Sequence, residues 1–325
     1  YGGVRRAGGR LRISTELTDA ERGTILRTDR YDGVEADLFD LQDRIAEEVV
    51  ATIAPQLREQ EIARALRKSP DTLSAYDLVL QALDQIGRLD EEALRRAEEL
   101  LHSATAADPD HALAYTYTAW VHVLRIAQGW SSDVDAESIA ASRAAAAAVE
   151  RDRRDALALA IRGHTLGYVT RDFDLAAELL SQAVAARPSC ALAWTFGAAL
   201  HCWRDDGARA VEWAGRALRL SPLDPFSFYY QHVLAQAHYT AGDMAREVEV
   251  ARRAELSNPH HAPTLRVLIA ALAGAGLRDD AARAAGRLTS LDPAFSLRRY
   301  AARTPLSGAA REAFIERLRQ AGLPD

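Results

Sequence analysis

The nine histidines of this chain are the residues whose chemistry could include metal binding. The nearest pairs are His260 with His261 and His232 with His238. Two histidines that share a metal on one helix face stand about four residues apart, because a turn holds about 3.6 residues. The interval from His232 to His238 misses that spacing, and the adjacent pair follows Pro259, which predicts a turn. We therefore expect no bound metal and no cofactor.

Motifs for nucleophilic or phosphate chemistry are equally weak. His201 and Cys202 are neighbours, so a helix would point their side chains about 100° apart, which is unsuitable for a nucleophile and its base. The glycine pairs at 2–3 and 8–9 lack the strand before and the helix after that a dinucleotide-binding loop needs, and they predict turns. The sequence contains no glycine-rich phosphate loop, zinc-binding histidine helix or nucleophile elbow. We predict that the chain is not an enzyme.

Charge and composition limit the partners. The 325 residues carry a formal net charge of −6, the wrong sign for attraction to a polyphosphate backbone, so we expect no nucleic-acid partner. Lys68 is the only lysine. Some repeat arrays clamp an acidic C-terminus of a chaperone with several lysines and asparagines, and this chain cannot build that clamp.

Two further features concern the cellular setting. Cys190 and Cys202 are too few for a disulfide framework or a four-ligand zinc site, which favours a reducing cytoplasm. No run of about 18 apolar residues is free of charge, so we expect no membrane contact by this region. The chain begins at Tyr1 and its only methionine is Met244, so we expect it to be part of a longer protein.

The elements that position these residues follow from proline-containing turns at a nearly constant interval. The prolines are Pro109, Pro188, Pro222, Pro259 and Pro293. The gap between the first two holds two units, with Glu150–Arg153 where another Asp-Pro would fall. Counted through Arg153, the positions of successive turns differ by 44, 35, 34, 37 and 34. A period of about 34 residues predicts an array of helical hairpins.

The clearest unit runs from Ala191 to Asp224. It has an early aromatic residue, a small pair, a turn, further small residues and a closing proline: Trp194, Gly197, Ala198, Asp206, Gly207, Ala210, Ala214, Ala217 and Pro222. This pattern resembles a tetratricopeptide repeat, which implies two antiparallel helices in about 34 residues. Small side chains let two helices approach closely, and proline ends the second helix.

The other units keep the same spacing but lack some of the residues of this pattern. Their small or apolar triplets are Ala97, Leu101 and Ala104, then Ala141, Ala145 and Ala148, then Ala176, Leu180 and Ala183, then Ala281, Ala285 and Leu288. Glu247 stands where a small residue belongs, so we expect that helix pair to splay. Six hairpins from about Ser74 to Pro293 are predicted, with an amphipathic helix at Arg311–Ala321 capping the last.

The segment 1–70 follows another pattern. Apolar Leu11 and Ile13 alternate with polar residues, and after a turn at 19–23 a second extended run reaches Tyr31, which predicts a β-hairpin. Apolar residues then recur every four positions from Leu38 to Leu57, predicting a long helix capped by Asp40 and kinked at Pro55. We expect residues 1–70 to be the C-terminal part of an α/β domain and residues 71–325 to form the array. The fold class is mainly α.

A second resemblance covers nearly the whole chain. Segments Val4–Ile13, Arg30–Asp32 and Leu38–Ala46 resemble the closing strands and last helix of a TolB N-terminal-like domain. Such a domain precedes a tetratricopeptide array in certain bacterial class III adenylate cyclases and winged-helix transcriptional regulators. Segments Ala75–Leu78, Leu220–Pro225 and Gly322–Asp325 are similar to short sequence motifs found in those arrays.

The resemblance implies a non-catalytic regulatory and protein-interaction region of a bacterial signalling protein, such as an adenylate cyclase. The alternative is the sensor half of a winged-helix regulator. No segment matches a cyclase catalytic domain, so no catalytic residue is assigned.

In such arrays the first helix of each hairpin supplies the inner face, where a protein or peptide partner would bind in a concave groove. The residues on that face are Thr116, Trp120, Thr195, Trp203, Phe226, Tyr229, Gln236 and Arg266. Aromatic residues and arginine dominate recognition energy at protein interfaces. Trp120, Trp203 and Phe226 have two open interpretations, because they could instead fill the seams between helices. Tyr229, Gln236 and Arg266 are the better binding candidates. Because the N-terminal hairpin lacks upstream partner strands, we expect it to pack against the array, to pair with a second copy of itself, or to stay mobile.

Overall fold

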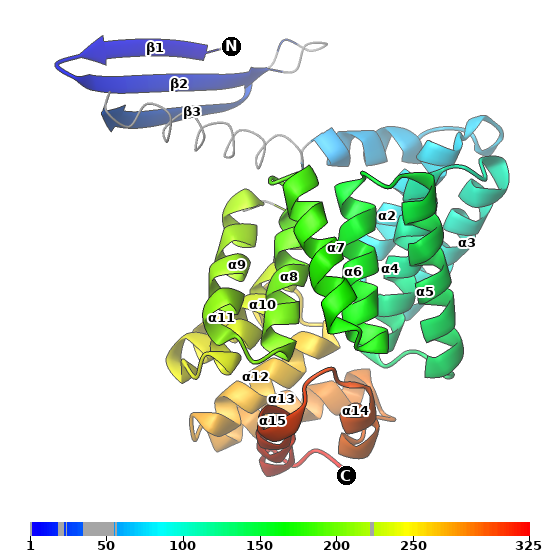
Figure 1. The fold of residues 1–325 in the computed structure, drawn as a ribbon, viewed down its shortest axis with the longest axis vertical. Coiled ribbons are helices and arrows are strands. Elements are labelled where there is room, and N and C mark those ends of the chain that lie inside the picture. The colour runs from blue at the N-terminus through cyan, green and yellow to red at the C-terminus, as the bar shows by residue number, and fades with distance from the viewer. Residues whose placement is uncertain (1, 19–22, 24, 35–54, 56, 222–223) are drawn as a thin grey trace.

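The computed structural model describes residues 2–18, 23, 25–34, 55, 57–221 and 224–325. Figure 1 shows a small antiparallel sheet near the N-terminus and a stack of paired helices that continues to the C-terminus. This arrangement confirms the mainly α fold with an N-terminal β element. Most of the expected helix from Leu38 to Leu57, with its cap at Asp40 and its kink at Pro55, lies outside the described residues.

The sheet has three strands in the order β1–β2–β3: β1 (Gly2–Ala7), β2 (Arg10–Thr18) and β3 (Ile25–Val34). Pairing of β2 with β3 confirms the predicted hairpin, and Gly8 and Gly9 form a turn with φ of 57° and 74°. The turn predicted at 2–3 is wrong, because these glycines lie in β1 opposite Thr15 and Ser14. All six residues of β1 are exposed, so no alternation of apolar and polar residues marked this strand.

One face of the sheet is apolar. Leu11 and Tyr31 are buried together, with Ile13 packed beside them. On the opposite face, Arg12 Nε donates to Asp32 Oδ1 at 2.6 Å, and the two residues are register partners across β2 and β3. The sheet therefore has one face that needs a cover and one that tolerates water.

Six helical hairpins follow, as predicted. They are α2 (Ala75–Arg88) with α3 (Glu91–Ala107), α4 (Ala112–Gln128) with α5 (Val134–Arg151), α6 (Ala156–Thr165) with α7 (Phe173–Ala186), α8 (Ala191–Trp203) with α9 (Gly207–Leu220), α10 (Ser227–Thr240) with α11 (Met244–Ser257), and α12 (Ala262–Gly274) with α13 (Arg278–Leu291). A short 3-10 turn, η2 (Pro70–Thr72), precedes them, and a π-helical turn, η3 (Leu166–Thr170), extends α6. The end of α13 agrees with the predicted boundary at Pro293.

Aspartate caps begin most of the second helices. The carboxylates of Asp90, Asp133, Asp172, Asp206 and Asp243 each accept a hydrogen bond from the third backbone N–H of the helix that follows. A capping carboxylate satisfies an otherwise unpaired N–H and favours the positive end of the helix dipole. The turns of the repeat are thus specified locally.

Small residues bring the two helices of a hairpin together. Ala210, Ala214 and Ala217 of α9 are fully buried. A Cβ on Gly197 of α8 would lie 2.3 Å from the ring of Trp213, closer than any side chain tolerates. Glycine at position 197 is therefore needed for α8 and α9 to pack across that indole.

Glu247 does not make its hairpin splay, which corrects the prediction. Helices α10 and α11 pack as closely as α8 and α9 do. The Glu247 side chain is 1% exposed, and its Oε2 lies 3.5 Å from Nη1 of Arg317. The acidic residue is accommodated because the C-terminal helix supplies its counter-charge.

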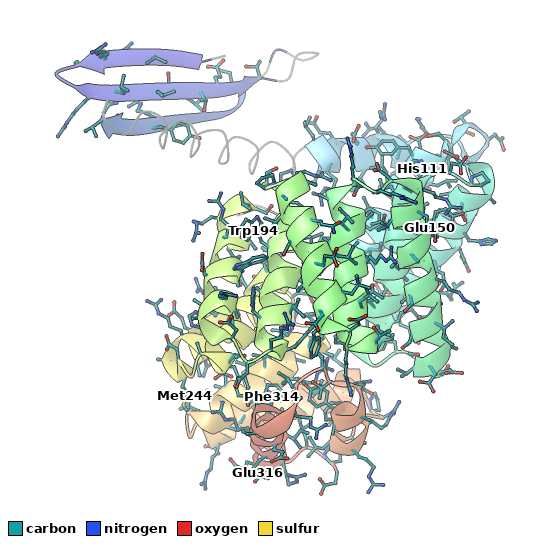
Figure 2. The ribbon with its side chains drawn as sticks, in the orientation of Figure 1. His111, Glu150, Trp194, Met244, Phe314 and Glu316 are labelled. Atoms are coloured by element: carbon teal, nitrogen blue, oxygen red, sulfur yellow. The ribbon has the colours of Figure 1, made fainter. Side chains whose placement is uncertain are left out.

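The C-terminal segment adds α14 (Leu297–Arg303), which was not predicted, and α15 (Gly308–Gln320), which was. Phe314 of α15 is buried and packs edge-on against Tyr239, whereas Glu316 is exposed (Figure 2). The backbone N–H of Leu297 donates to the carbonyl of Pro324 at 2.8 Å, which holds the end of the chain against α14. The face of α15 that carries Phe314 packs on α12.

The array closes on itself. Gln128, at the end of α4, donates from Nε2 to the carbonyl of His260 at 3.1 Å and accepts from the N–H of Ala262 at 2.9 Å. Arg266 Nη2 donates to the carbonyl of Ala127 at 2.7 Å. These bonds join positions that differ by 132 to 139 in the sequence, so the inner helices α4 and α12 are in contact.

Candidate functional site

The inner helices surround a cavity of about 70 Å³. Its wall comes from α4, α6 with η3, α8, α10 and α12, and from the C-terminal segment through Tyr300, Thr304 and Phe314. Typical small-molecule pockets are about 300–1,000 Å³, so this cavity suits a ligand of only a few heavy atoms. It is the meeting point of five of the six hairpins.

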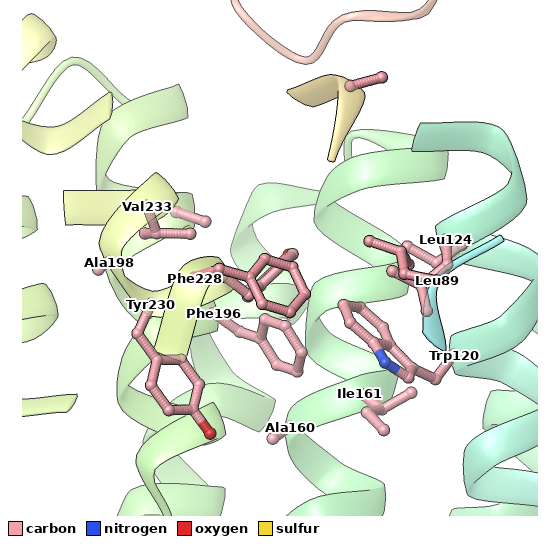
Figure 3. Close-up of a cluster of buried hydrophobic side chains, with 14 of the residues drawn as sticks. Leu89, Trp120, Leu124, Ala160, Ile161, Phe196, Ala198, Phe228, Tyr230 and Val233 are labelled. Atoms are coloured by element: carbon pink, nitrogen blue, oxygen red, sulfur yellow. The ribbon is translucent and has the colours of Figure 1, made fainter. Parts of the chain in front are cut away.

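Five of the eight residues predicted on the inner face line this cavity. They are Trp120, Trp203, Tyr229, Gln236 and Arg266. Trp120 packs against Phe196 (Figure 3), with ring centroids 5.2 Å apart. The ring of Tyr229 lies edge-on to Trp120, with centroids 5.3 Å apart. Trp120 and Trp203 are also buried, at 3% and 6% exposure, so both indoles fill the interior between helices.

The other three predicted residues do not reach the cavity. Thr116 and Thr195 are buried, and their hydroxyls donate to the carbonyls of Ala112 and Ala191 one turn earlier in the same helix. Phe226 is half-buried and packs against Phe228, with ring centroids 5.8 Å apart. Their side chains serve local helix and seam contacts.

Three buried histidines lie in or beside the cavity. Burial lowers the pKa of His164 and of His232 to about 3, and lowers the pKa of His261 well below its usual value. The rings of His232 and His261 are 5.1 Å apart, and His164 Nε2 is 3.3 Å from the hydroxyl of Tyr229. These imidazoles are neutral at pH 7, because a charge in this apolar setting would lose its hydration.

Arg266 is the buried charge of the cavity. Its side chain is 4% exposed, and burial, with the nearby charge of Arg303, lowers its pKa to about 10. The guanidinium lies 5.2 Å from the centre of the Tyr300 ring. Arg266 therefore keeps its charge at neutral pH inside a wall of aromatic side chains.

Groups that could do chemistry elsewhere are separated in the structure. Burial raises the pKa of the Cys202 thiol to about 12, whereas His201 packs against the ring of Trp213. Both cysteines are free. Across the described part of the chain, no group of three or more His, Cys, Asp or Glu side chains is placed to hold a metal ion. The cavity, with its polar groups and aromatic wall, is the site on which these observations converge.

Comparison with known proteins identifies the architecture. No family model matches the chain. The crystal structure of the APC/C hetero-tetramer Cut9-Hcn1 aligns with 88% of this chain and 49% of that one, at a TM-score of 0.56 and 12% identity. TTC0263, a thermophilic TPR protein in Thermus thermophilus, aligns with 61% of this chain and 99% of that one, at a TM-score of 0.47 and 13% identity. The fold is a tetratricopeptide-repeat array.

One curated relative is similar in sequence. "Putative adenylate cyclase 3" of Rhizobium meliloti (strain 1021) is 27% identical over 130 residues, which cover 40% of this chain and 22% of that protein. The chain therefore spans about a fifth of that relative's length. Within the residues that the structure describes, no helix of the tetratricopeptide array or its flanks is long and apolar enough to cross a membrane.

Sequence reasoning missed several cavity residues, notably His164, Tyr168 and Tyr300. Tyr168 lies in η3, and such π-helical turns are frequent at functional sites of proteins. A Cβ on Gly167 would lie 2.8 Å from the ring of Trp203, so glycine lets that indole approach η3. Gly163 and Gly167, one turn apart in a predicted inner helix of the tetratricopeptide array, were the available signal.

Proposed function

We propose that the chain is a non-catalytic regulatory scaffold within a longer cytoplasmic signalling protein of the bacterial adenylate cyclase type. The observation that carries this proposal is the closure of the array, in which Gln128 and Arg266 join α4 of the second hairpin to the last hairpin. A closed array offers a stable body through which two other parts of a protein can be held or coupled. The 27% identity to "Putative adenylate cyclase 3" supports the cyclase setting.

A peptide lying along the inner face does not fit the closed array. The cavity is far smaller than an extended peptide, and its wall is buried. We therefore place the contact with a protein partner on the outer surface. A groove there, between α3 and α5, is lined by Arg95, His102, Tyr115 and Arg143. The guanidinium of Arg151 lies 4.0 Å from the centre of the Tyr115 ring, and this cation–π contact holds the ring in the wall of the groove.

The N-terminal sheet has a separate role in this proposal. Residues 1–70 form the end of an α/β domain of the TolB N-terminal-like kind, and residues 71–325 form the array. The Lys68 ammonium lies 2.6 Å from the Asp77 carboxylate at the start of α2. This ion pair ties the segment that ends at Lys68 to the first hairpin of the array.

The experiment has two arms. This 325-residue chain is assayed alone for cyclisation of ATP and for ester and phosphate hydrolysis, and the proposal expects no turnover. The longer parent protein is assayed for cyclic nucleotide with the array intact and with Arg143→Glu in the outer groove, and the proposal expects a changed rate. Turnover by the chain alone, lost when a cavity residue is substituted, would overturn the proposal. A parent protein that binds DNA and makes no cyclic nucleotide would identify the regulator instead.

A further inference from the structure

The cavity holds a positive charge that the protein itself does not neutralise. Arg266 Nη2 donates to the carbonyl of Ala127, but Nη1 has no hydrogen-bond partner among the described residues. The side chain is only 4% exposed and forms part of the cavity wall. An unpaired polar atom of a buried charged group costs free energy, so its partner is to be sought in the cavity.

The nearest carboxylate is already shared. Asp292 is 6% exposed, and its Oδ2 lies 3.9 Å from Nη2 of Arg303 on α14. Gly129 packs directly against the same carboxylate, where a Cβ would lie 2.5 Å from Oδ2. The guanidinium groups of Arg266 and Arg303 thus both interact electrostatically with the single carboxylate of Asp292. The neighbourhood of the cavity has an excess of positive charge.

Neutral donors complete the polar side of the wall. His232 and His164 each have an Nδ1 with no hydrogen-bond partner among the described residues, and both line the cavity. A neutral imidazole can present N–H at Nδ1 and donate to an anion. The rest of the wall is mainly apolar, with Trp120, Val233 and Phe314, and also contains the polar side chains of Gln236 and Thr304. The cavity therefore offers one charge and a few neutral polar groups on a largely hydrophobic surface.

We propose that this cavity binds a small carboxylate, of the size of formate or acetate, through Nη1 of Arg266 with His232 as a second donor. A planar carboxylate matches the guanidinium, and its hydrocarbon part meets the aromatic wall. A cavity of about 70 Å³ excludes nucleotides and peptides. A phosphate dianion would need a second positive partner in the wall, where Arg266 is the one charged residue among those that the structure describes.

Ligand binding acts on the closure of the array. The same guanidinium that meets the carboxylate also holds α12 to the carbonyl of Ala127 on α4. An anion that neutralises and orients Arg266 stabilises the closed form, because it binds that form selectively. This inference goes beyond the proposed scaffold function, since the site binds its ligand whether or not the array contacts a protein partner.

The test is a titration of the 325-residue chain with sodium acetate, followed by calorimetry and thermal unfolding. Sodium chloride at equal ionic strength and neutral acetamide are the control solutes. We expect saturable acetate binding that raises the unfolding midpoint, and no such effect from acetamide or chloride. Arg266→Gln should weaken acetate binding at least ten-fold, while Arg298→Gln, an exposed arginine of α14, should bind as the parent chain does. Equal effects of acetamide or chloride, or unchanged binding by Arg266→Gln, overturn the proposal.

A second measurement needs no substitution, because Arg266→Gln also removes the bond to Ala127 and could prevent folding. The chain is labelled with ¹⁵N-arginine, and its guanidinium resonances are followed during the acetate titration. We expect one guanidinium to shift in proportion to the calorimetric saturation, and none to shift with acetamide. Absence of any guanidinium shift at saturating acetate overturns the proposal independently of the variants.

Discussion

The carboxylate of Glu247 on α11 lies 3.5 Å from the guanidinium of Arg317 on α15, inside the protein. Arg317 also lies over the ring of Tyr239, with its guanidinium carbon 5.0 Å from the ring centre. Glu247 Oε1 has no hydrogen-bond partner among the described residues. Glu247, which replaces a small residue of the repeat pattern, therefore forms the ion pair that binds the C-terminal helix α15 to α11.

This contact predicts a pH-dependent stability. Burial raises the pKa of Glu247 to about 7, against 4.5 for the exposed group. The folded chain therefore holds this proton more tightly than the unfolded chain, and the resulting stability is present below pH 4.5 and is lost as the pH rises to about 7. Glu247→Gln should unfold with less pH dependence across that window. The expected difference between pH 8 and pH 5 is roughly 2–3 kcal/mol in chemical denaturation.

Exposed Glu249→Gln, two residues along α11, is the matched control for Glu247→Gln and should follow the parent chain. If Glu247→Gln shows the same pH dependence as the parent chain, the carboxylate is not buried beside Arg317 as described.

The buried histidines predict the opposite slope. A lowered pKa means that the unfolded chain binds protons more readily, so stability is full above pH 6.5 and is lost as the pH falls toward 3. His164 stacks on Phe196 with ring centroids 4.1 Å apart, so phenylalanine can take its place. We expect His164→Phe to lose less stability than the parent chain between pH 7 and pH 5, by about 2 kcal/mol. Exposed His102→Phe should leave the slope unchanged, and an equal slope for both variants would contradict a neutral, buried His164.

Two glycines in helices predict opposite results. Gly197→Val should destabilise the chain by about 1–3 kcal/mol, because the new side chain collides with Trp213. Gly286→Ala in α13 meets no atom within 4 Å and should stabilise it by about 0.5–1 kcal/mol through helix propensity. Urea denaturation measures both. A neutral Gly197→Val would mean that α8 and α9 do not approach across that indole.

The N-terminal sheet predicts self-association. Strand β1 is an exposed edge of the sheet, and Val4 is 67% exposed on it. Unpaired edges of this kind template pairing with another chain. Light scattering over a concentration series should show a dimer that Val4→Pro disrupts, because proline removes an edge hydrogen bond and fixes the backbone. A strict monomer at every concentration would rule this pairing out.

Local signals in the sequence were enough to predict the hairpins. Alanines at fixed intervals and a closing proline act between neighbouring helices, so they can be recognised within a single repeat. Strand β1 left no such signal, because all six of its residues are exposed and none of them is a buried apolar residue. The interaction of Glu247 with Arg317 was missed because the two residues lie far apart in the sequence, on helices of different units.

The site was predicted only in part for the same reason. Trp203, Tyr229 and Arg266 were found because their residue types and their helices both pointed inward. The closure that converts an open groove into a cavity depends on Gln128 meeting His260, and no repeat pattern encodes a contact over 132 positions. It follows from the accumulated rotation of five stacked hairpins, which packing sets and a single unit does not reveal.

Closure of the array is the central claim, and a distance measurement between α4 and α12 tests it most directly. Spin labels are placed at exposed Ser132 and His260, beside the two helix ends that Gln128 joins, with Cys190 and Cys202 replaced by alanine. Pulsed electron resonance should give one short, narrow distance distribution for this pair, and a longer, broader one when Gln128→Ala removes the two bonds. A long and broad distribution in the otherwise unaltered chain would show an open superhelix and contradict the closed array.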